Sequence, residues 1–336
     1  MQLGIGQFTC QQRPDDDRPM NKIYDEMLEL GCIIDDAGLD SAWVSEYHFS
    51  NDGYMPGIIP ALSALAAVTN DIELGPCIAL APLYNPIRLA EDIATIDLIA
   101  GGRTTLGFGI GSNIDLLNAF GIAENERVDR LTDTIDVIRG AWSEGPLNYE
   151  SNFHETPADI DVTPKPAHDV PIMFGGVAKP AVRRAARIGD GWCAPQGLPL
   201  EAIRKRVADI ETVRENEGID SDFQVYLVLD GFVGDSHELA WETMREGYFY
   251  TTRRYAEIDS GEPVDELSTE QKRDLKEQAI FGTAEQVVNE LQTYRDALGD
   301  DVHIIFRSYH PNIGTEEMAS CIRRLGDEVR PELVRA

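Results

Sequence analysis

Residues 172–194 read IMFGGVAKPAVRRAARIGDGWCA, and this stretch decides the fold. Residues 172–174 are an apolar strand candidate, residues 179–188 are an amphipathic helix candidate, and residues 191–194 are a second strand candidate. A short strand, a helix and another short strand in this order are typical of a βαβ unit. We therefore expect parallel strands that are joined by helices.

The same alternation extends in both directions from this unit. The strand candidates are residues 3–7, 42–45, 72–80, 105–109, 172–174, 191–194, 224–231 and 302–306. The helix candidates lie near residues 20–37, 57–69, 88–99, 127–142, 179–188, 200–216, 236–251 and 315–329. Eight repeats favour closure into a (β/α)₈ TIM barrel, an α/β fold.

One barrel with insertions accounts for all 336 residues, so we expect a single domain over residues 1–336. Two gaps exceed the usual connection length, residues 143–170 and residues 252–282, and both are interpreted as insertions. Ser268 precedes a polar run that indicates a helix start inside the second insertion. Because this insertion follows a helix, the sequence leaves open whether it reaches the active-site end.

The chain is strongly acidic, with 29 basic residues, only six of them lysine, against 59 acidic residues and a net charge of −30. This surface repels nucleic-acid phosphates and anionic lipid, so neither is an expected partner. The combination resembles proteins of salt-loving microbes and predicts a halophilic protein. The alternative is an ordinary acidic enzyme.

The amino terminus MQLGIGQF lacks the basic and apolar regions of a signal peptide, and no apolar run is long enough to span a membrane. These features predict a cytoplasmic protein. Five scattered cysteines without a CxxC pair argue against a disulfide framework and a zinc cluster. His48, His303 and His310 lack metal-ligand spacing, so no metal site is predicted.

In a parallel barrel the active site is built at the carboxyl ends of the strands. Glu46, Tyr47 and His48 follow the second strand candidate. A carboxylate and an imidazole two residues apart can together donate, accept and position a proton. The alternative is a structural hydrogen-bonded pair.

Small residues mark the next strand ends. Prolines and small residues around Cys77 and Ile78 indicate a bulge or the close approach of a ligand. Gly107, Gly109 and Gly111 free one strand face of side chains, which leaves room for a flat ligand. The alternative is a tapered barrel interior, and the spacing does not fit a dinucleotide-binding fingerprint.

A glycine pair, Gly175 and Gly176, opens the helix candidate at 179–188. Backbone amides at a helix start suit a phosphate group, and Lys179 would add charge. The alternative is a tight turn without a ligand.

Taken together, the ordered motifs make the sequence similar to the bacterial-luciferase-like family of flavin-dependent monooxygenases and oxidoreductases. The similarity is strong over residues 1–200 and weak in the carboxyl-terminal third. The motifs are Glu46-Tyr47-His48-Phe49, Leu74-Gly75 with Pro82 and Pro86, Leu89-Ala90-Glu91-Asp92 with Asp97, Gly101-Gly102-Arg103, Leu106-Gly107-x-Gly-x-Gly, Phe120-Gly121, Gly175-Gly176, Arg183-Arg184-Ala185-Ala186-Arg187 and Gly189-Asp190-Gly191-Trp192.

The resemblance implies a flavin site. A non-prolyl cis peptide that presses on the flavin ring would match Cys77-Ile78, and the ring would lie near Gly109 and Gly111. The resemblance also places the flavin phosphate near Gly175, Gly176 and Val177. Together with Lys179, these three positions form the expected phosphate cradle.

The resemblance places His48 at the reacting edge of the ring. Luciferases carry paired histidines after the glutamate, whereas Tyr47 stands at the first of these positions here, so bioluminescence is not predicted. Arg307, at the end of the eighth strand, would hold an anionic substrate or the flavin; the alternative is a salt bridge to a carboxylate.

The implied activity is an FMN-dependent monooxygenase that uses reduced flavin and O₂ on a small organic substrate, with a separate flavin reductase as partner. One alternative is a hydride-transfer oxidoreductase that uses the deazaflavin coenzyme F-420. Another is a flavin-binding relative without turnover. By analogy with the family, we expect a homodimer.

We expect the unfolding temperature to rise by several degrees as KCl is raised from 0.1 M to 1 M. The reason is that the Debye length falls from about 10 Å to about 3 Å, which screens carboxylate repulsion. Thermal unfolding followed by circular dichroism checks this, and an unchanged midpoint would support the ordinary acidic alternative.

Overall fold

The computed structural model describes residues 1–157 and 159–334. Its centre is a parallel β-sheet whose strands follow the order β3-β2-β1-β10-β8-β7-β6-β5-β4, with β9 paired to β8. The strands are β1 (Gln2–Phe8), β2 (Ser41–Val44), β3 (Glu73–Pro76), β4 (Ala79–Leu80), β5 (Leu106–Gly109), β6 (Ile172–Gly175), β7 (Gly191–Ala194), β8 (Gln224–Val233), β9 (Ile280–Gly282) and β10 (Val302–Arg307).

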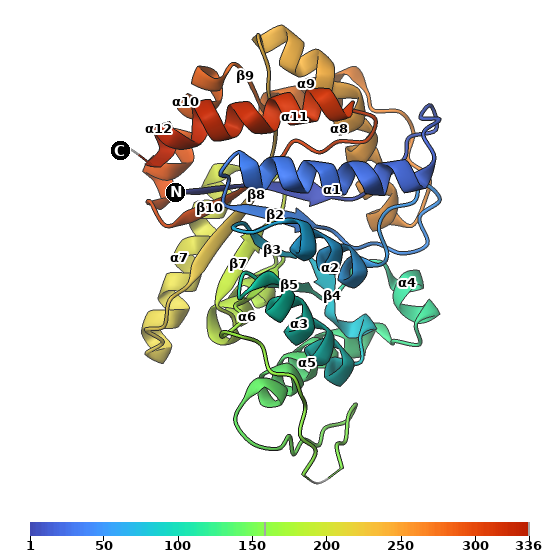
Figure 1. Cartoon of the computed structure of the whole chain (residues 1–336), viewed down its shortest axis with the longest axis vertical. Helices are drawn as coiled ribbons and strands as arrows, with labels where there is room; N and C mark the ends of the chain where they lie inside the picture. The colour runs from blue at the N-terminus through green and yellow to red at the C-terminus, as the bar shows by residue number, and fades with distance from the viewer. Residues whose placement is uncertain (158, 335–336) are drawn as a thin grey trace.

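The helices are arranged around the outside of these strands (Figure 1). They are α1 (Met20–Asp36), α2 (Ile58–Val68), α3 (Pro86–Ala100), α4 (Ile114–Ala119), α5 (Arg127–Trp142), α6 (Lys179–Ile188), α7 (Leu200–Glu217), α8 (His237–Ser260), α9 (Thr269–Gln278), α10 (Ala284–Leu298), α11 (Thr315–Arg324) and α12 (Arg330–Val334). Within the described ranges, no helix combines the length and the apolar character needed to cross a membrane.

The barrel closes through its third strand, which has two parts. β3 pairs with β2, β4 pairs with β5, and a bridge joins Leu74 to Thr104. The two parts are separated at Cys77 and Ile78, and the peptide bond between these residues is cis, as the resemblance implied. The predicted continuous strand over residues 72–80 is therefore interrupted at the bulge that its small residues and prolines indicated, and the predicted α/β barrel is confirmed.

Two apolar layers hold the barrel together. The larger layer lies between the strands and the surrounding helices and includes Leu3, Ile5 and Phe108. A smaller cluster fills the barrel interior with Trp43, Cys77, Met173, Cys193, Tyr226, Val228 and Ile305. The Trp43 and Tyr226 rings meet edge to face at 5.5 Å, an arrangement that aromatic pairs favour.

The carboxyl-terminal third contains more helix than the sequence analysis expected. Helix α8 continues to Ser260, nine residues beyond the predicted end, and so occupies the start of the expected 252–282 insertion. Ser268 caps α9 as its sequence indicated. Helix α10 was missed, although Thr283 and Gln286 form a capping box that marks its start.

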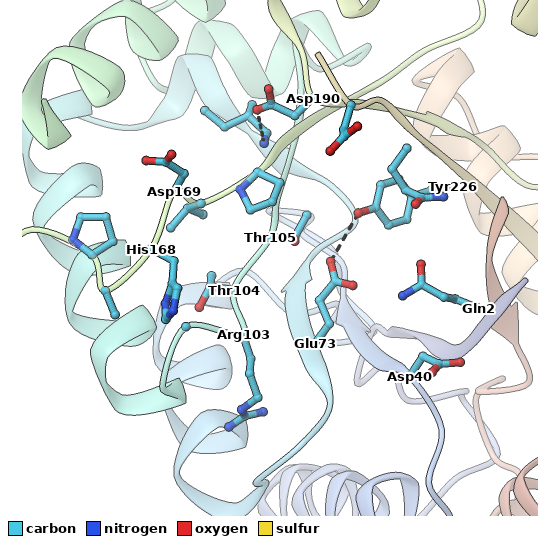
Figure 2. A pocket seen from close by; sticks show the side chains of 18 of the residues that line it. Gln2, Asp40, Glu73, Arg103, Thr104, Thr105, His168, Asp169, Asp190 and Tyr226 are labelled. Carbon is cyan, nitrogen blue, oxygen red and sulfur yellow. Dashed lines mark hydrogen bonds between the residues drawn. The ribbon is translucent and has the colours of Figure 1, made fainter. Parts of the chain in front are cut away.

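A cavity of about 1850 Å³ opens at the amino ends of the strands (Figure 2). The first residues of several strands line it, among them Gln2, Glu73 and Gln224. An ion pair of 2.8 Å between Arg330 and Asp40 lies in its wall. In barrel enzymes this end serves stability, whereas catalysis takes place at the opposite end.

His303 is fully buried near this end of the barrel. Its Nε2 lies 2.7 Å from Ser41 Oγ, and its Nδ1 lies 3.6 Å from Glu73 Oε2. Burial lowers the pKa of His303 to about 4 and raises the pKa of Glu73. The imidazole is therefore neutral at pH 7, and its approach to Glu73 is not an ion pair.

We expect His303 to weaken the fold as the pH falls from 6.5 towards 4. In this window the unfolded chain binds a proton at His303, with a pKa of 6.5, and the folded chain does not, with a pKa of about 4. The His303→Gln variant should therefore lose less free energy of unfolding than the wild type, by up to about 3 kcal/mol at about 1.36 kcal/mol per pKa unit. Urea unfolding between pH 4 and 8 measures the difference, and identical slopes for both proteins would contradict the assignment.

Candidate active site

The carboxyl ends of the barrel strands surround an opening, here called the mouth. The Glu46 carboxylate fixes several side chains at this mouth. Glu46 follows β2 and is buried, and it accepts hydrogen bonds from Leu80 N (2.6 Å) and Tyr84 Oη (2.6 Å). His48 Nε2 lies 2.9 Å from the same carboxylate. Burial, together with the charge of Glu46, raises the pKa of Tyr84, so its hydroxyl remains a donor. Glu46 therefore fixes the direction of the His48 ring, as in the predicted Glu-x-His pair.

His48 lies at the edge of the mouth, where its side chain is 16% exposed. The Phe120 ring meets the imidazole edge to face at 5.0 Å, and Phe49 lies beside both rings. Phe49 is 72% exposed, so this aromatic group borders the solvent. The imidazole is thus positioned by one buried carboxylate and remains accessible from outside.

Tyr47 points to a different part of the mouth. Its hydroxyl accepts a hydrogen bond of 3.0 Å from Asn113 Nδ2, and the same amide lies 3.3 Å from Ile258 O of α8. The Tyr47 and Tyr54 ring centroids are 5.7 Å apart. These contacts join the segment after β2 to the segment after β5 and to α8.

Arg307 is the last residue of β10, and its contacts form a second polar group at the mouth, apart from the contacts of Glu46. Its Nη1 donates to Asp230 Oδ1 at 2.8 Å, which is the salt bridge considered as the alternative for this residue. The Tyr255 ring covers the guanidinium at 5.3 Å. Tyr255 and Tyr54 share a hydrogen bond of 2.7 Å between their hydroxyls, and Tyr54 also donates to Ser45 Oγ. This series of side-chain contacts connects Arg307 with the segment that carries Glu46 and Tyr47.

Helix α8 reaches the mouth, which answers the question that the sequence left open about residues 252–282. Asp52, in the segment after β2, accepts hydrogen bonds from Arg254 (3.3 Å), Tyr250 (3.0 Å) and Gln11 (2.8 Å). Burial alone would raise the pKa of Asp52, but the hydrogen bonds from Ser50, Gln11 and Tyr250 and the charge of Arg254 lower it overall. A buried, charge-assisted contact therefore fixes α8 over the mouth.

The predicted cofactor-binding glycines lie around Ile78. A β-carbon at Gly109 would lie 2.2 Å from Ile78 Cδ1, and one at Gly175 would lie 2.8 Å from the same atom. The space that the glycines leave is therefore occupied by Ile78, which corrects the expectation of an open strand face at Gly109. At Gly111 the nearest atom to a β-carbon is 3.6 Å away, and its φ of +75° suits glycine. A flat ligand would thus rest on Ile78 with Gly111 beyond it.

The predicted phosphate cradle lies at the start of α6. Its N-cap residue, Ala178, makes no side-chain cap hydrogen bond, and Gly176 has a φ of +121°. Lys179 Nζ is 3.7 Å from Asp209, and its side chain is 54% exposed. Arg206, which the sequence analysis missed, donates from Nε to Val177 O at 2.8 Å. Backbone amides and two cations therefore meet at the positive end of a helix.

Several site residues were not predicted from the sequence. Tyr84 and Asn113 follow strands and Asp230 lies in the last four residues of β8, so a systematic inspection of the carboxyl-terminal part of every strand would have found them. Arg254 and Tyr255 are on α8, where no local motif distinguishes them from surface residues. A cleft of about 660 Å³ lies beside this region and is lined by Asp230, Tyr248 and residues of α9 and α10.

Comparison with known proteins connects this geometry to a family. The sequence profile of luciferase-like monooxygenases matches residues 1–301. An F420-dependent glucose-6-phosphate dehydrogenase from Amycolatopsis mediterranei is 25% identical over 81% of this chain and 85% of that protein. The oxygenase component of a flavin-dependent trigonelline monooxygenase from Acinetobacter baylyi is 24% identical over 96% of this chain and 94% of that protein.

Solved structures show the same fold. The monooxygenase RslO1 from Streptomyces bottropensis superposes with a TM-score of 0.87 at 22% identity, over 98% of this chain and 99% of that chain. The oxygenating constituent of 3,6-diketocamphane monooxygenase from Pseudomonas putida, in complex with FMN, has a TM-score of 0.81 at 18% identity, over 98% of both chains.

Proposed function

Because the chain belongs to the luciferase-like monooxygenase family, we propose that it is an FMN-dependent monooxygenase that uses reduced flavin and O₂ to oxygenate a small organic substrate. The observation that carries the proposal is the mouth itself, where Glu46 of the Glu46–His48 pair accepts a hydrogen bond from Leu80 of the interrupted third strand, and where the uncapped start of α6 follows the carboxyl end of β6. The nearly full-length match to an oxygenase component supports oxygen chemistry and a separate flavin reductase as partner.

The residues present fit FMN. Gly175, Gly176 and Val177 lead into the uncapped amides of α6, where Lys179 and Arg206 would balance a phosphate. The ring would rest on the Cys77–Ile78 bond, with Gly109 beneath Ile78 and Gly111 beyond it. When it is bound in reduced form, FMN supplies the electrons with which O₂ is activated.

The protein groups at the mouth position the substrate and move protons. Glu46 holds Nε2 of His48, so the imidazole exchanges protons with the substrate through Nδ1. The Tyr47 hydroxyl, held by Asn113, offers a second polar contact about the same opening. Phe49 and Phe120 border His48 and limit the access of water to it.

A second candidate is hydride transfer with the deazaflavin coenzyme F-420. It is favoured by relatives named F420-dependent glucose-6-phosphate dehydrogenase, at 25% identity in Amycolatopsis mediterranei and 27% in Kineococcus radiotolerans. The same ring seat and phosphate cradle would serve this coenzyme. The acidic-His-Phe-x-Pro-Trp type of segment, which F-420 enzymes commonly carry after the second strand, is absent here.

We also propose that the protein is a cytoplasmic homodimer. Val68 of α2 and Leu98 and Ile99 of α3 are apolar and 39%, 48% and 51% exposed. These two helices pack against each other beside the early strands, so a second copy would cover their apolar side chains.

We expect the apoprotein to bind FMN and, once the flavin is reduced, to consume O₂. FMN binding is measured by titrating the protein with FMN in high salt and monitoring the flavin fluorescence. A parallel titration with coenzyme F-420 tests the alternative. Oxygen uptake with a panel of small organic substrates then tests turnover. Binding of F-420 with no oxygen uptake would overturn the proposal in favour of hydride transfer, and binding without any turnover would indicate a flavin carrier.

We expect the His48→Gln variant to lower kcat by about 10²-fold or more, because general acid–base groups contribute on that order. Tyr47→Phe should lower it by a smaller factor, since only the hydroxyl is removed and the aromatic ring is kept. His154→Gln is the matched control, because His154 also pairs with a carboxylate, Asp133, but lies in the 143–170 segment. Equal kcat values for His48→Gln and His154→Gln would contradict the role of His48.

A further inference from the structure

Arg307 has hydrogen-bond donors that the protein does not use. The residue is 1% exposed, and its Nη1 donates to Asp230 at 2.8 Å. Its Nε and Nη2 atoms find no partner among residues 1–157 and 159–334. Buried donors of a charged group without partners are costly, so these two atoms are expected to meet a ligand.

The chemistry of that ligand follows from the two atoms concerned. Nε and Nη2 form the side of the guanidinium that binds both oxygens of a carboxylate. Three other arginines of this chain use the same pair of atoms in this way. Arg13 binds Asp15 at 2.9 Å and 2.9 Å, Arg18 binds Asp16 at 2.9 Å and 2.6 Å, and Arg330 binds Asp40 at 3.1 Å and 2.8 Å.

The surroundings of Arg307 favour a monoanion. Asp230 already places one carboxylate on the guanidinium, and burial raises the pKa of Asp230, which shows that negative charge is costly there. A dianionic phosphate would therefore be repelled more strongly than a carboxylate. Burial, with the charge of Arg307, lowers the pKa of His310, whereas a hydrogen bond with the Arg307 backbone acts in the opposite direction. The neutral imidazole therefore adds no positive charge that would favour a dianion.

The position of Arg307 also suits a substrate. Arg307 is paired in the barrel with Gly6, and the next residue, Gln7, donates from Nε2 to Cys77 O. In the strand order, β1 and β2 lie between β10 and β3, and the Gln7 side chain extends from β1 to the bond on which the flavin ring would rest. The 660 Å³ cleft reaches Asp230 and Tyr248, and its volume is in the range of small-molecule sites.

We propose that Nε and Nη2 of Arg307 bind the carboxylate of the substrate, and that the substrate is therefore a small organic acid. This inference rests on the proposed function, because it assigns the substrate class of the same site. It makes Arg307 a residue that determines specificity, and Asp230 the group that orients its guanidinium.

The test compares carboxylates with their neutral amides. Binding of benzoate and benzamide, and of butyrate and butyramide, is measured by calorimetry at constant KCl, both on the protein as purified and on the protein with FMN added. We expect the wild type to bind at least one of the acids about 10-fold or more tighter than its amide. Equal affinity within both pairs would overturn the proposal.

The variant Arg307→Lys keeps the charge opposite Asp230 but lacks the two-atom side of the guanidinium. We expect it to lose the preference for the acid by about 10-fold or more, whereas Arg330→Lys, which alters the matching pair at the amino end, should keep it. Retention of the preference in Arg307→Lys would overturn the proposal. If that variant does not fold, the double variant Arg307→Met/Asp230→Leu removes both charges together and should show the same loss.

FMN titration of the apoprotein separates this inference from the proposed function. FMN binding without a preference for acids would refute the carboxylate site and leave the flavin proposal intact. A preference for acids that is lost in Arg307→Lys, in a protein that does not bind FMN, would support the carboxylate site and refute the flavin proposal.

Discussion

The interruption of the third strand between Pro76 and Ala79 is the constraint on which the mouth of the barrel depends. It lets Ile78 pack over the glycines of the neighbouring strands, and it directs Leu80 N to the Glu46 carboxylate. A regular strand would keep its amides in the ladder and leave this buried carboxylate with fewer donors. The backbone irregularity therefore supplies the hydrogen bond that fixes Glu46, and Glu46 in turn fixes His48.

The carboxyl-terminal third of the chain supplies part of the active-site mouth, together with segments from the first half. Helix α8 contacts the segment after β2 through Arg254 and Tyr255, and the Tyr54–Tyr255 hydrogen bond extends this contact towards Arg307. The mouth is thus assembled from segments that lie about 200 positions apart in the chain. The match to the family profile covers residues 1–301, and Arg307 follows this range.

Two arginines at opposite ends of the barrel differ in how their side-chain donors are used. At the amino end, Arg330 uses Nε and Nη2 to bind Asp40. At the carboxyl end, the same atoms of Arg307 have no partner in the described residues. Since native proteins satisfy nearly all buried polar groups, the two unused donors of Arg307 indicate a binding role for this residue.

The sequence by itself determined the barrel, because apolar strands and amphipathic helices of the right length alternate along it and each pattern is local. It also predicted the Glu46–His48 pair and the glycine turn before α6, since each is a short motif at a strand end, whereas the cis Cys77–Ile78 bond was implied by the resemblance to the family. Only the tertiary structure decided that Ile78 occupies the space above Gly109. It alone showed that α8 covers the mouth and that Asp230 uses one side of Arg307. These contacts join residues that are distant in sequence, and no local pattern encodes which side chains the closed barrel brings together.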